Sequence, residues 1–425
     1  FIQLDRPLDF VSLSDHAELL GEVNLCTTPG TWTYWHPVCV AHRSSGTLSM
    51  ILLAGRSLGF RSRWGFCGDK GEHCLGEAGS VWEEIKRSAE EAYDRSSSCR
   101  FTSFVGYEWT ASMDEGKNLH RNVVFRNERV PKLPSSWIET PSASALWDHL
   151  DRDCLDAGEG CDVLTIPHNS NISSGLMFRS AKIEESAAPH PEVDAAEAKR
   201  RQRMEPIIEI MQHKGSSECD VVAGWSNDET CGFETLAYDS FGGGRPSMFT
   251  PPAQLPAANN FVRWALTEGL RQQQTLGVNG LKYGIIASTD THIAAPGLTT
   301  EDAAHPGHGG FGKGEGADTT NEFADNIEFG PGGLAVAWAE ENTRDSIFEA
   351  MLRREVYGTS GTRPTVRFFG GWDYPETLCD NPEMVAQGYA AGVPMGGDLP
   401  AKTENADAPR FVVAAMKDAG SATVR

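Results

Sequence analysis

The sequence predicts an α/β fold, and three observations lead to this prediction. Short apolar segments rich in β-forming residues recur along the chain. Amphipathic segments with helical periodicity lie between them, and strands that alternate with helices favour a parallel sheet or barrel. The length of 425 residues exceeds one average domain but suits a single α/β barrel with long insertions.

The expected elements follow one another along the chain. Strands are expected at residues 8–14, 101–109, 119–125, 162–167, 207–211, 283–288 and 334–339, and helices at 81–94, 144–150, 261–272 and 344–353. The chain after residue 363 is rich in turn residues, with one β-like run at 364–369. We therefore expect the barrel over residues 1–363 and a small accessory β-rich element, cut short at its end, over 364–425.

The charge and the hydropathy of the chain narrow the classes of partner. The formal net charge is −22, from 59 acidic and 37 basic residues. Such a field repels nucleic acids and anionic membranes, so we expect neither as a partner. No apolar run approaches the roughly 20 residues that a bilayer span requires. An anionic substrate requires metal ions or local cations that invert the sign of the field at the site.

The ten cysteines favour disulfide bonds. None has the Cys-x-x-Cys spacing of a structural zinc site. Several fall in near pairs, namely Cys67 with Cys74, Cys154 with Cys161, Cys219 with Cys231, and Cys26 with Cys39. Disulfides are typical of exported proteins, so we expect a periplasmic or secreted protein; reduced, buried thiols are the alternative.

Metal-binding side chains stand at the ends of the expected strands. The set consists of Asp15, His16, Glu108, His168, His213, Asp290 and His292. Barrels and doubly wound sheets place their sites at the carboxyl ends of the strands, so we expect these side chains to meet. Neutral imidazoles combined with carboxylates are ligands for zinc, manganese or iron. Any one of them alone is more often structural, and the prediction rests on their occurring together.

The order Asp-His, Glu, His, His, Asp-x-His resembles the PHP (polymerase and histidinol phosphatase) superfamily. The segments LDRPLDFVSLSDHAELLG, GYEWT, NLHRNVVF, IPHNSN, QHKGSSE and STDTH resemble more narrowly an uncharacterised and often exported bacterial family within it. This resemblance covers about residues 1–370. It implies a distorted (β/α)7 barrel, here with long loop insertions, and metal-dependent phosphoesterase chemistry with two or three divalent metal ions (Zn, Mn or Fe).

The resemblance also implies a role for each ligand. Glu108 would bridge two metals, and Asp290 would bind the first of them. His168 and His213 would complete the second metal, whereas His16 and His292 would hold a third. The resembled family carries a His-x-His motif and a further histidine on its first barrel strand, which this sequence lacks. We expect that the chain is truncated before that strand.

Further residues are candidates for catalysis and substrate binding. His120 and Arg121 could place a general acid and a cation near the leaving group; alternatively, His120 faces the core and Arg121 points outward. Asp15 is counted with the catalytic candidates. Lys214 and Arg363 could neutralise a sulfate or phosphate group, or be ordinary solvated charges. To these we add one residue that could orient the substrate or merely shape a turn, Asn169.

We therefore expect a metal-dependent hydrolase that cleaves a phosphate- or sulfate-type monoester of a small anionic molecule by means of a metal-bound hydroxide. One alternative is an amide or lactone hydrolase of the amidohydrolase type, which uses similar ligands. Another is an exported binding protein that retains the barrel without catalysis. Specificity is expected in the insertions at residues 24–80, 178–203 and 296–333, whose sequence does not identify a substrate. The oligomeric state is not predicted.

Overall fold

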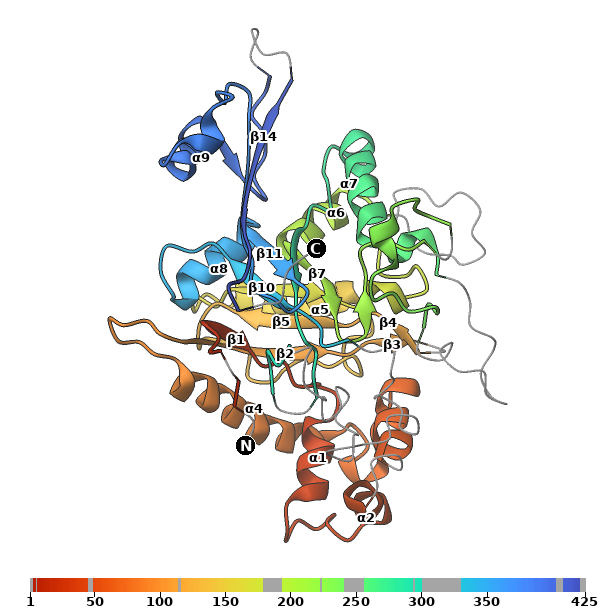
Figure 1. Ribbon diagram of the computed structural model, residues 1–425. Coiled ribbons are helices and arrows are strands. Elements are labelled where there is room, and N and C mark those ends of the chain that lie inside the picture. The colour runs from red at the N-terminus through yellow and green to blue at the C-terminus, as the bar shows by residue number, and fades with distance from the viewer. Residues whose placement is uncertain are drawn as a thin grey trace.

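The computed structural model describes residues 3–4, 6–44, 49–113, 116–178, 193–221, 224–240, 256–292, 295–299, 330–402 and 408–420. Most of the expected specificity insertions at 178–203 and 296–333 therefore lie outside the described residues. Within these ranges the protein has a mixed α/β fold, as the sequence predicts, and each expected strand and helix has a counterpart (Figure 1).

A four-stranded sheet forms the first half of the fold. It comprises β1 (Phe10–Ser12), β2 (Thr102–Trp109), β5 (Arg121–Phe125) and β6 (Val163–Pro167), in that order. β1 runs parallel to β2, whereas β5 is antiparallel to both β2 and β6. Every residue of β2 and β6 is buried, which explains why both read as continuous apolar runs rather than alternating ones. A short hairpin of β3 (Ser112–Met113) and β4 (Lys117–Asn118) precedes β5.

Two smaller sheets continue the arrangement. β7 (Ile207–Gln212) pairs with β9 (Gly284–Ala287) in parallel and with β8 (Gly215–Ser216) in antiparallel fashion. β10 (Leu334–Ala337) and β11 (Val356–Thr359) form an antiparallel pair. β7 lies beside β6, and β11 lies beside β9, so the three sheets follow one another around a common core. Across the described ranges the strands form no closed barrel.

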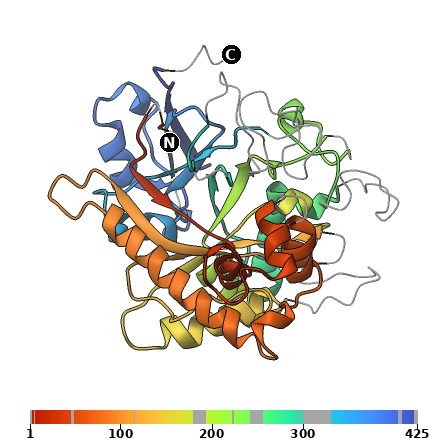
Figure 2. The same cartoon turned by 90° about the horizontal axis from the view of Figure 1, so that it is seen from below.

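Helices cover this core. The longest is α4 (Glu72–Ala92), which runs along β2 (Figures 1 and 2) and packs the buried Trp82 against Tyr107 and Phe125. A second cluster around Phe104, Leu164 and Phe348 joins α8 to the opposite side of the strands. The remaining helices of the core are α5 (Ala143–Leu150), α6 (Ala195–Met204), α7 (Val262–Leu276) and α8 (Arg344–Leu352).

A helical insertion between β1 and β2 and a small C-terminal sheet project at opposite ends of the molecule (Figure 1). The insertion contains α1 (Leu20–Thr27), α2 (Pro37–Ser44) and η1 (Met50–Gly59), followed by α4. In the C-terminal element β12 (Thr365–Gly371) pairs in antiparallel fashion with β13 (Gly392–Pro394) and β14 (Arg410–Met416), and α9 (Met384–Ala391) packs beside them. This sheet falls within the segment expected to be an accessory β-rich element.

Four disulfides are present, at the near pairs that the sequence indicates. They join Cys26 to Cys39, Cys67 to Cys74, Cys154 to Cys161, and Cys219 to Cys231. All ten cysteines lie in the described ranges, and the other two, Cys99 and Cys379, are thiols. Disulfides in this number are typical of an oxidising compartment. None of the described helices combines the length and the apolar character needed to cross a membrane.

Candidate metal centre

The carboxyl ends of β1 and β2 bring the first two predicted ligands together. Beyond the last pair of these strands, His16 forms a parallel bridge with Glu108. The backbone hydrogen bonds from Ala17 N–H to the Glu108 carbonyl and from Glu108 N–H to the Asp15 carbonyl fix this register, at 3.0 and 2.9 Å. His16 Nδ1 consequently lies 3.4 Å from Glu108 Oε2.

The reversed direction of β5 adds a residue to this edge that strand-end reasoning does not include. Because β5 is antiparallel to its neighbours, its first residues lie beside the last residues of β2 and β6. His120 directly precedes β5, and its Nδ1 lies 2.7 Å from Glu108 Oε1. His168, which follows β6, places Nε2 3.4 Å from the same oxygen. These three side chains form one group that could hold a metal ion.

The ends of β7 and β9 supply a second group, made of His213, Asp290 and His292. The pairing of these two strands shifts register between Glu209 and Met211, just before the turn that carries His213. Irregularities of this kind redirect side chains at sites. Asp290 has a φ of 48°, an uncommon left-handed conformation for a non-glycine residue. The ligand atoms of this group lie within 4.8 Å of one another.

His16 connects the two groups. Its Nε2 lies 3.1 Å from Nε2 of His292. The other nitrogen of His292, Nδ1, lies 2.9 Å from the backbone carbonyl of Asp290, which can only accept, so Nδ1 carries the proton and Nε2 presents a lone pair. A separation of 3.1 Å allows both Nε2 atoms to reach one metal at the about 2.0–2.1 Å typical of a zinc–histidine bond.

Two buried polar atoms of the first group also favour a metal site. Glu108 Oε1 and His168 Nε2 are buried, and their contacts within the described residues are few: Oε1 lies 2.7 Å from His120 Nδ1 and 3.4 Å from His168 Nε2. Buried polar atoms with few partners are costly, and a bound ion or water commonly completes their contacts. The donor set of imidazoles and carboxylates fits zinc, manganese or iron, so the residues present fit the metals that the sequence predicts.

Neighbouring charges and burial shift the pKa values of the ligands, and most of these shifts favour the deprotonated form that binds a cation. Burial alone would raise the pKa of Glu108, but His16, His168 and His120 outweigh it and hold that pKa well below its usual value. Burial lowers the pKa of His120 to about 4, so this ring is neutral at pH 7. For His168 the attraction of Glu108 overcomes burial and raises the pKa to about 9. Burial would raise the pKa of Asp290, but Lys214 together with His292 and His213 outweighs burial and lowers the pKa of that carboxylate.

All six predicted metal ligands therefore meet at one edge, but several other predicted residues play a different part. His120 is 7 % exposed, and its Nε2 lies 3.1 Å from the Ser112 hydroxyl. Both of its nitrogens are thus engaged, one toward Glu108 and one toward Ser112. A leaving group or a metal ion could therefore reach His120 only by displacing one of these two contacts, and its role as a general acid stays a prediction.

The prediction that Arg121 faces the leaving group is wrong. Its guanidinium is buried, forms an ion pair with Glu205 at 2.6 Å and lies over the ring of Trp109. Neighbouring residues of a strand point to opposite faces, so Arg121 faces away when His120 faces the centre. The alternative expectation of an outward, solvated Arg121 is also wrong, since only 2 % of this residue is exposed.

The three expected substrate-binding residues make protein contacts instead. Asn169 is 1 % exposed and accepts a hydrogen bond from Gln212. Lys214 contacts Asp290 and lies 2.6 Å from His213 Nε2, so its charge acts on two ligands. Arg363 lines the cleft described below, but its guanidinium donates to the carbonyls of Pro7 and Arg6 at 2.7 and 3.0 Å.

Sequence reasoning missed residues that support the ligands. Gln212 donates to Asn169 and to Asp290 and so links two strand ends. Asn122 Nδ2 lies 3.4 Å from His168 Nδ1. Glu209 is buried beneath the centre and accepts a hydrogen bond from Ser288; burial raises its pKa to about 7. Gln212 and Asn122 adjoin predicted site residues in the segments QHK and HRN, and this adjacency was the available signal.

The centre opens to a cleft of about 1330 Å³. The cleft runs between the β1 segment, including Phe10 and the exposed Asp15, and the β10 segment around Ala335. His16, Glu108, Asp290 and His292 form part of its lining. A molecule in the cleft would therefore reach four of the ligands, with Asp15 as the exposed carboxylate beside them.

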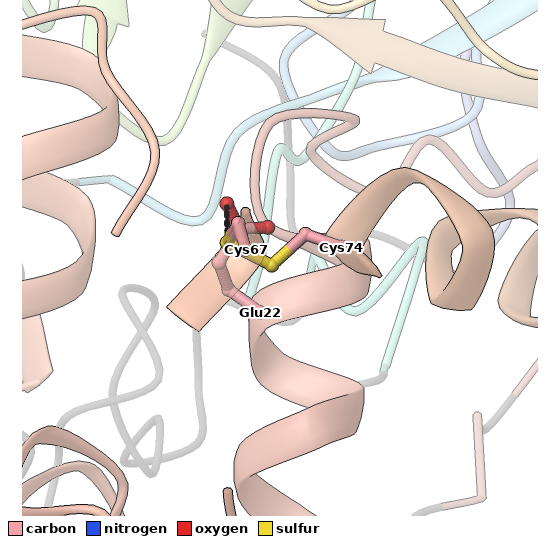
Figure 3. Close-up of side chains that lie close together, drawn as sticks. All are labelled: Glu22, Cys67 and Cys74. Carbon is pink, nitrogen blue, oxygen red and sulfur yellow. Dashed lines mark hydrogen bonds between the residues drawn. A yellow bond between two sulfur atoms is a disulfide. The ribbon is translucent and has the colours of Figure 1, made fainter. Parts of the chain in front are cut away.

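A third cluster, in the helical insertion, has metal-ligand atoms at similar distances but a different character. It consists of Glu22, Cys67 and Cys74 (Figure 3). Cys67 and Cys74 are joined by a disulfide, and Cys67 Sγ lies 3.5 Å from Glu22 Oε1. A disulfide sulfur has neither a proton to donate nor a thiolate to offer, so this is a close contact and not a metal site. Arg63 neutralises Glu22 at 2.7 Å.

Comparison with known proteins identifies the family of the chain. No curated protein and no solved structure matches it significantly. One family model does match, over residues 1–425, and its description is a protein family of unknown function, DUF3604. Because this match extends over the whole chain, the protein belongs to the DUF3604 family.

Proposed function

We propose that this protein is a metal-dependent hydrolase that cleaves phosphate- or sulfate-type monoesters in the cleft between β1 and β10. The observation that carries the proposal is the pair of Nε2 atoms of His16 and His292, 3.1 Å apart, at the junction of two carboxylate–histidine groups. Two or three divalent metal ions bound there would activate water and neutralise the oxygens of an ester.

Individual residues of the chain have distinct roles in this proposal. Glu108 is the shared carboxylate of the first group: His16 lies beside its Oε2, and His120 and His168 lie beside its Oε1. Lys214 adds a positive charge beside Asp290, which favours an anionic substrate despite the acidic surface. Asp15 is exposed in the cleft next to His16, so it is our candidate for moving a proton to or from the leaving group.

We further propose that the fold is related to a PHP-type barrel and is open between β1 and β10 within the described residues. Supporting this, the strands follow one another in the order β1-β2-β5-β6-β7-β9-β11-β10 around one core. The cleft separates the two ends of that series. β1 and β10 are apolar in sequence yet only half-buried, as expected of strands that lack a neighbour on one side. An oxidising compartment would be the periplasm or the extracellular space.

Metal content and activity, measured together, test the proposal. The protein purified without chelators should contain two or three equivalents of zinc, manganese or iron by inductively coupled plasma mass spectrometry. A panel of phosphate esters, sulfate esters, amides and lactones, offered to the same preparation, should show turnover of the monoesters. The variant Asp290→Ala should lose metal and turnover together, whereas the control Glu84→Ala, at an exposed position of α4, should retain both.

The outcomes separate the alternatives. Turnover of the amides or lactones alone would replace the ester proposal by an amidohydrolase-type one. A folded protein that binds no metal, or an Asp290→Ala variant with wild-type activity, would refute the hydrolase proposal and favour a binding protein on the same fold.

A further inference from the structure

We infer that Thr110, held by the buried carboxylate of Glu18, is a positioning residue that fixes the tautomer of His16. The inference rests on the proposed metal centre and adds to it the device that presents His16 Nε2 as a lone pair. Neither Thr110 nor Glu18 belongs to the ligand set, and neither touches the cleft.

The contact between Thr110 and His16 is short and partly buried. Thr110 Oγ1 lies 2.6 Å from His16 Nδ1, and Thr110 is fully buried. A hydroxyl can accept or donate, so this contact alone does not decide which ring nitrogen carries the proton. The second neighbour of Nδ1 is Glu108 Oε2, 3.4 Å away, a carboxylate oxygen that favours a proton on Nδ1. A proton on Nδ1 faces these two oxygens and leaves the Nε2 lone pairs of His16 and His292 3.1 Å apart, where they can share a cation. The opposite tautomer would donate from His16 Nε2 to His292 Nε2, and the experiments below distinguish the two.

Glu18 fixes the backbone that carries Thr110. Its Oε1 accepts hydrogen bonds from the N–H groups of Thr110 and Trp137, at 3.1 and 2.6 Å. The residue is 0 % exposed, so two backbone donors from separate segments are satisfied inside the protein by one carboxylate oxygen. Removing that acceptor would leave both donors buried without a partner, which is a large penalty. Glu18 thereby fixes the backbone position of Thr110, whose hydroxyl contacts His16.

The position of Glu18 in the chain couples it to His16 as well. It lies two residues after His16, on the segment that leads into α1, and its backbone carbonyl accepts a hydrogen bond from Arg63 at 3.2 Å. The same segment therefore carries the ligand and the group that organises the ligand's hydrogen-bond partner. Groups that orient metal-binding histidines in this way change metal affinity by about 10- to 100-fold when they are removed.

A matched pair of variants tests the role of the hydroxyl. Thr110→Val keeps the shape of the side chain and removes the hydroxyl, whereas Thr110→Ser keeps the hydroxyl. We expect Thr110→Val to weaken the binding of one metal equivalent by about 10- to 100-fold, measured by titrating the chelated protein with Zn²⁺. Thr110→Ser should restore wild-type affinity. Both should unfold at nearly the temperature of the wild type, so a general loss of structure would not explain the difference.

A second measurement does not depend on any bound metal. Long-range ¹H–¹⁵N correlation spectra of the chelated, histidine-labelled protein report the tautomer of each ring, and His16→Asn assigns the signal. The wild type and Thr110→Ser should show His16 protonated on Nδ1, and Thr110→Val should shift the population toward Nε2. A wild-type His16 protonated on Nε2, or a Thr110→Val variant with unchanged tautomer and metal affinity, would overturn the inference.

Glu18 is tested in the same assays. Glu18→Gln retains an oxygen that accepts from both backbone N–H groups, so it should behave as the wild type. Glu18→Met, of similar size, should reproduce the tautomer shift of Thr110→Val; an unchanged His16 in a folded Glu18→Met variant would remove Glu18 from the inference. If the wild type shows the expected tautomer but binds no metal, the positioning inference stands and the proposed function fails.

Discussion

Two buried clusters of this protein look alike by distance and differ in chemistry. One is the Glu22–Cys67–Cys74 group of the helical insertion, and the other is the Glu108–His120–His168 group at the strand ends. In each, a buried carboxylate lies close to two further potential ligands. In the insertion, however, the two cysteines are bonded to each other and Arg63 supplies the charge that Glu22 requires.

At the strand ends the charges are arranged in the opposite way. Glu108 is surrounded by imidazoles rather than by a guanidinium, and the nitrogens of His16, His120 and His168 lie 2.7 to 3.4 Å from its oxygens. A neutral imidazole offers a lone pair but does not compensate a buried charge unless it takes up a proton or shares a cation. The comparison shows that distance between ligand atoms is a weak criterion for a metal site. The decisive question is whether the charge that balances the carboxylate is permanent, as on a guanidinium, or is a proton that a metal ion can displace from an imidazole.

The largest expected effect comes from removing each carboxylate in turn. Glu108→Ala should abolish metal binding at the centre and lower ester turnover by at least about 10³-fold, because it removes the carboxylate that His16, His120 and His168 all contact. Glu22→Ala should leave the metal content of the folded protein unchanged. Metal analysis and activity of the two purified variants, side by side, measure this. Loss of metal from a folded Glu22→Ala variant would show that the insertion holds a metal after all.

The next largest effect is expected in the free energy of unfolding rather than in metal binding. Arg63→Met leaves Glu22 buried without its main cationic partner, which for a buried ion pair costs about 3–5 kcal/mol. Denaturant unfolding of the chelated protein measures the loss. The double variant Arg63→Met/Glu22→Gln should recover much of it, since neither charge then remains. An Arg63→Met variant as stable as the wild type would mean that the cluster is not balanced by this ion pair.

Much of this fold follows from local sequence patterns. Apolar runs such as those of β2 and β6 identify buried strands, and the carboxyl-end rule then gathers all six predicted ligands from five separate segments. The cysteine spacings likewise give the four disulfides, because a disulfide between residues 7 to 13 apart needs only a local turn.

The remainder depends on relations that no local pattern records. Nothing within residues 119–125 indicates that β5 runs antiparallel to its neighbours, and this direction is what brings His120 to the ligands. Arg121 reads as an exposed or catalytic cation because its partner, Glu205, is 84 residues away in the sequence. Thr110, Glu18 and Gln212 are common polar residues whose roles arise only from tertiary contacts.

Removing a disulfide should have a smaller effect, and the chain offers a matched control. Cys67–Cys74 and Cys154–Cys161 both close loops with a sequence separation of 7, so chain entropy predicts a similar loss of about 2–3 kcal/mol for each. Cys67→Ser/Cys74→Ser and Cys154→Ser/Cys161→Ser should therefore be compared by thermal unfolding. A larger loss at the first pair would measure its coupling to Glu22 and Arg63. Neither variant should lose metal if the insertion is purely structural.

The smallest expected effect is a proton released on metal binding, which only the strand-end cluster should show. Glu108 raises the pKa of His168 to about 9 against the opposing effect of burial, so this ring is protonated at pH 7 in the metal-free protein. The protonated His168 ring adds to the free energy of unfolding of the metal-free protein. This contribution is complete below the unfolded-state pKa of about 6.5 and is lost as the pH rises through 9. A metal binds only the neutral ring, so metal affinity should rise about tenfold per pH unit from 7 to 9 and then level off.

Calorimetric titration with Mn²⁺ in two buffers of different ionisation enthalpy counts this proton directly. At pH 7 we expect the release of about one proton from His168, because the pKa of His120 lies near 4 and that ring has none to lose. His168→Gln should bind the metal more weakly and release one proton fewer. If the wild type binds Mn²⁺ at pH 7 without releasing a proton, His168 is already neutral there. The charge of Glu108 would then be balanced by some other group, and the contrast between the two clusters would rest on the disulfide and Arg63 alone.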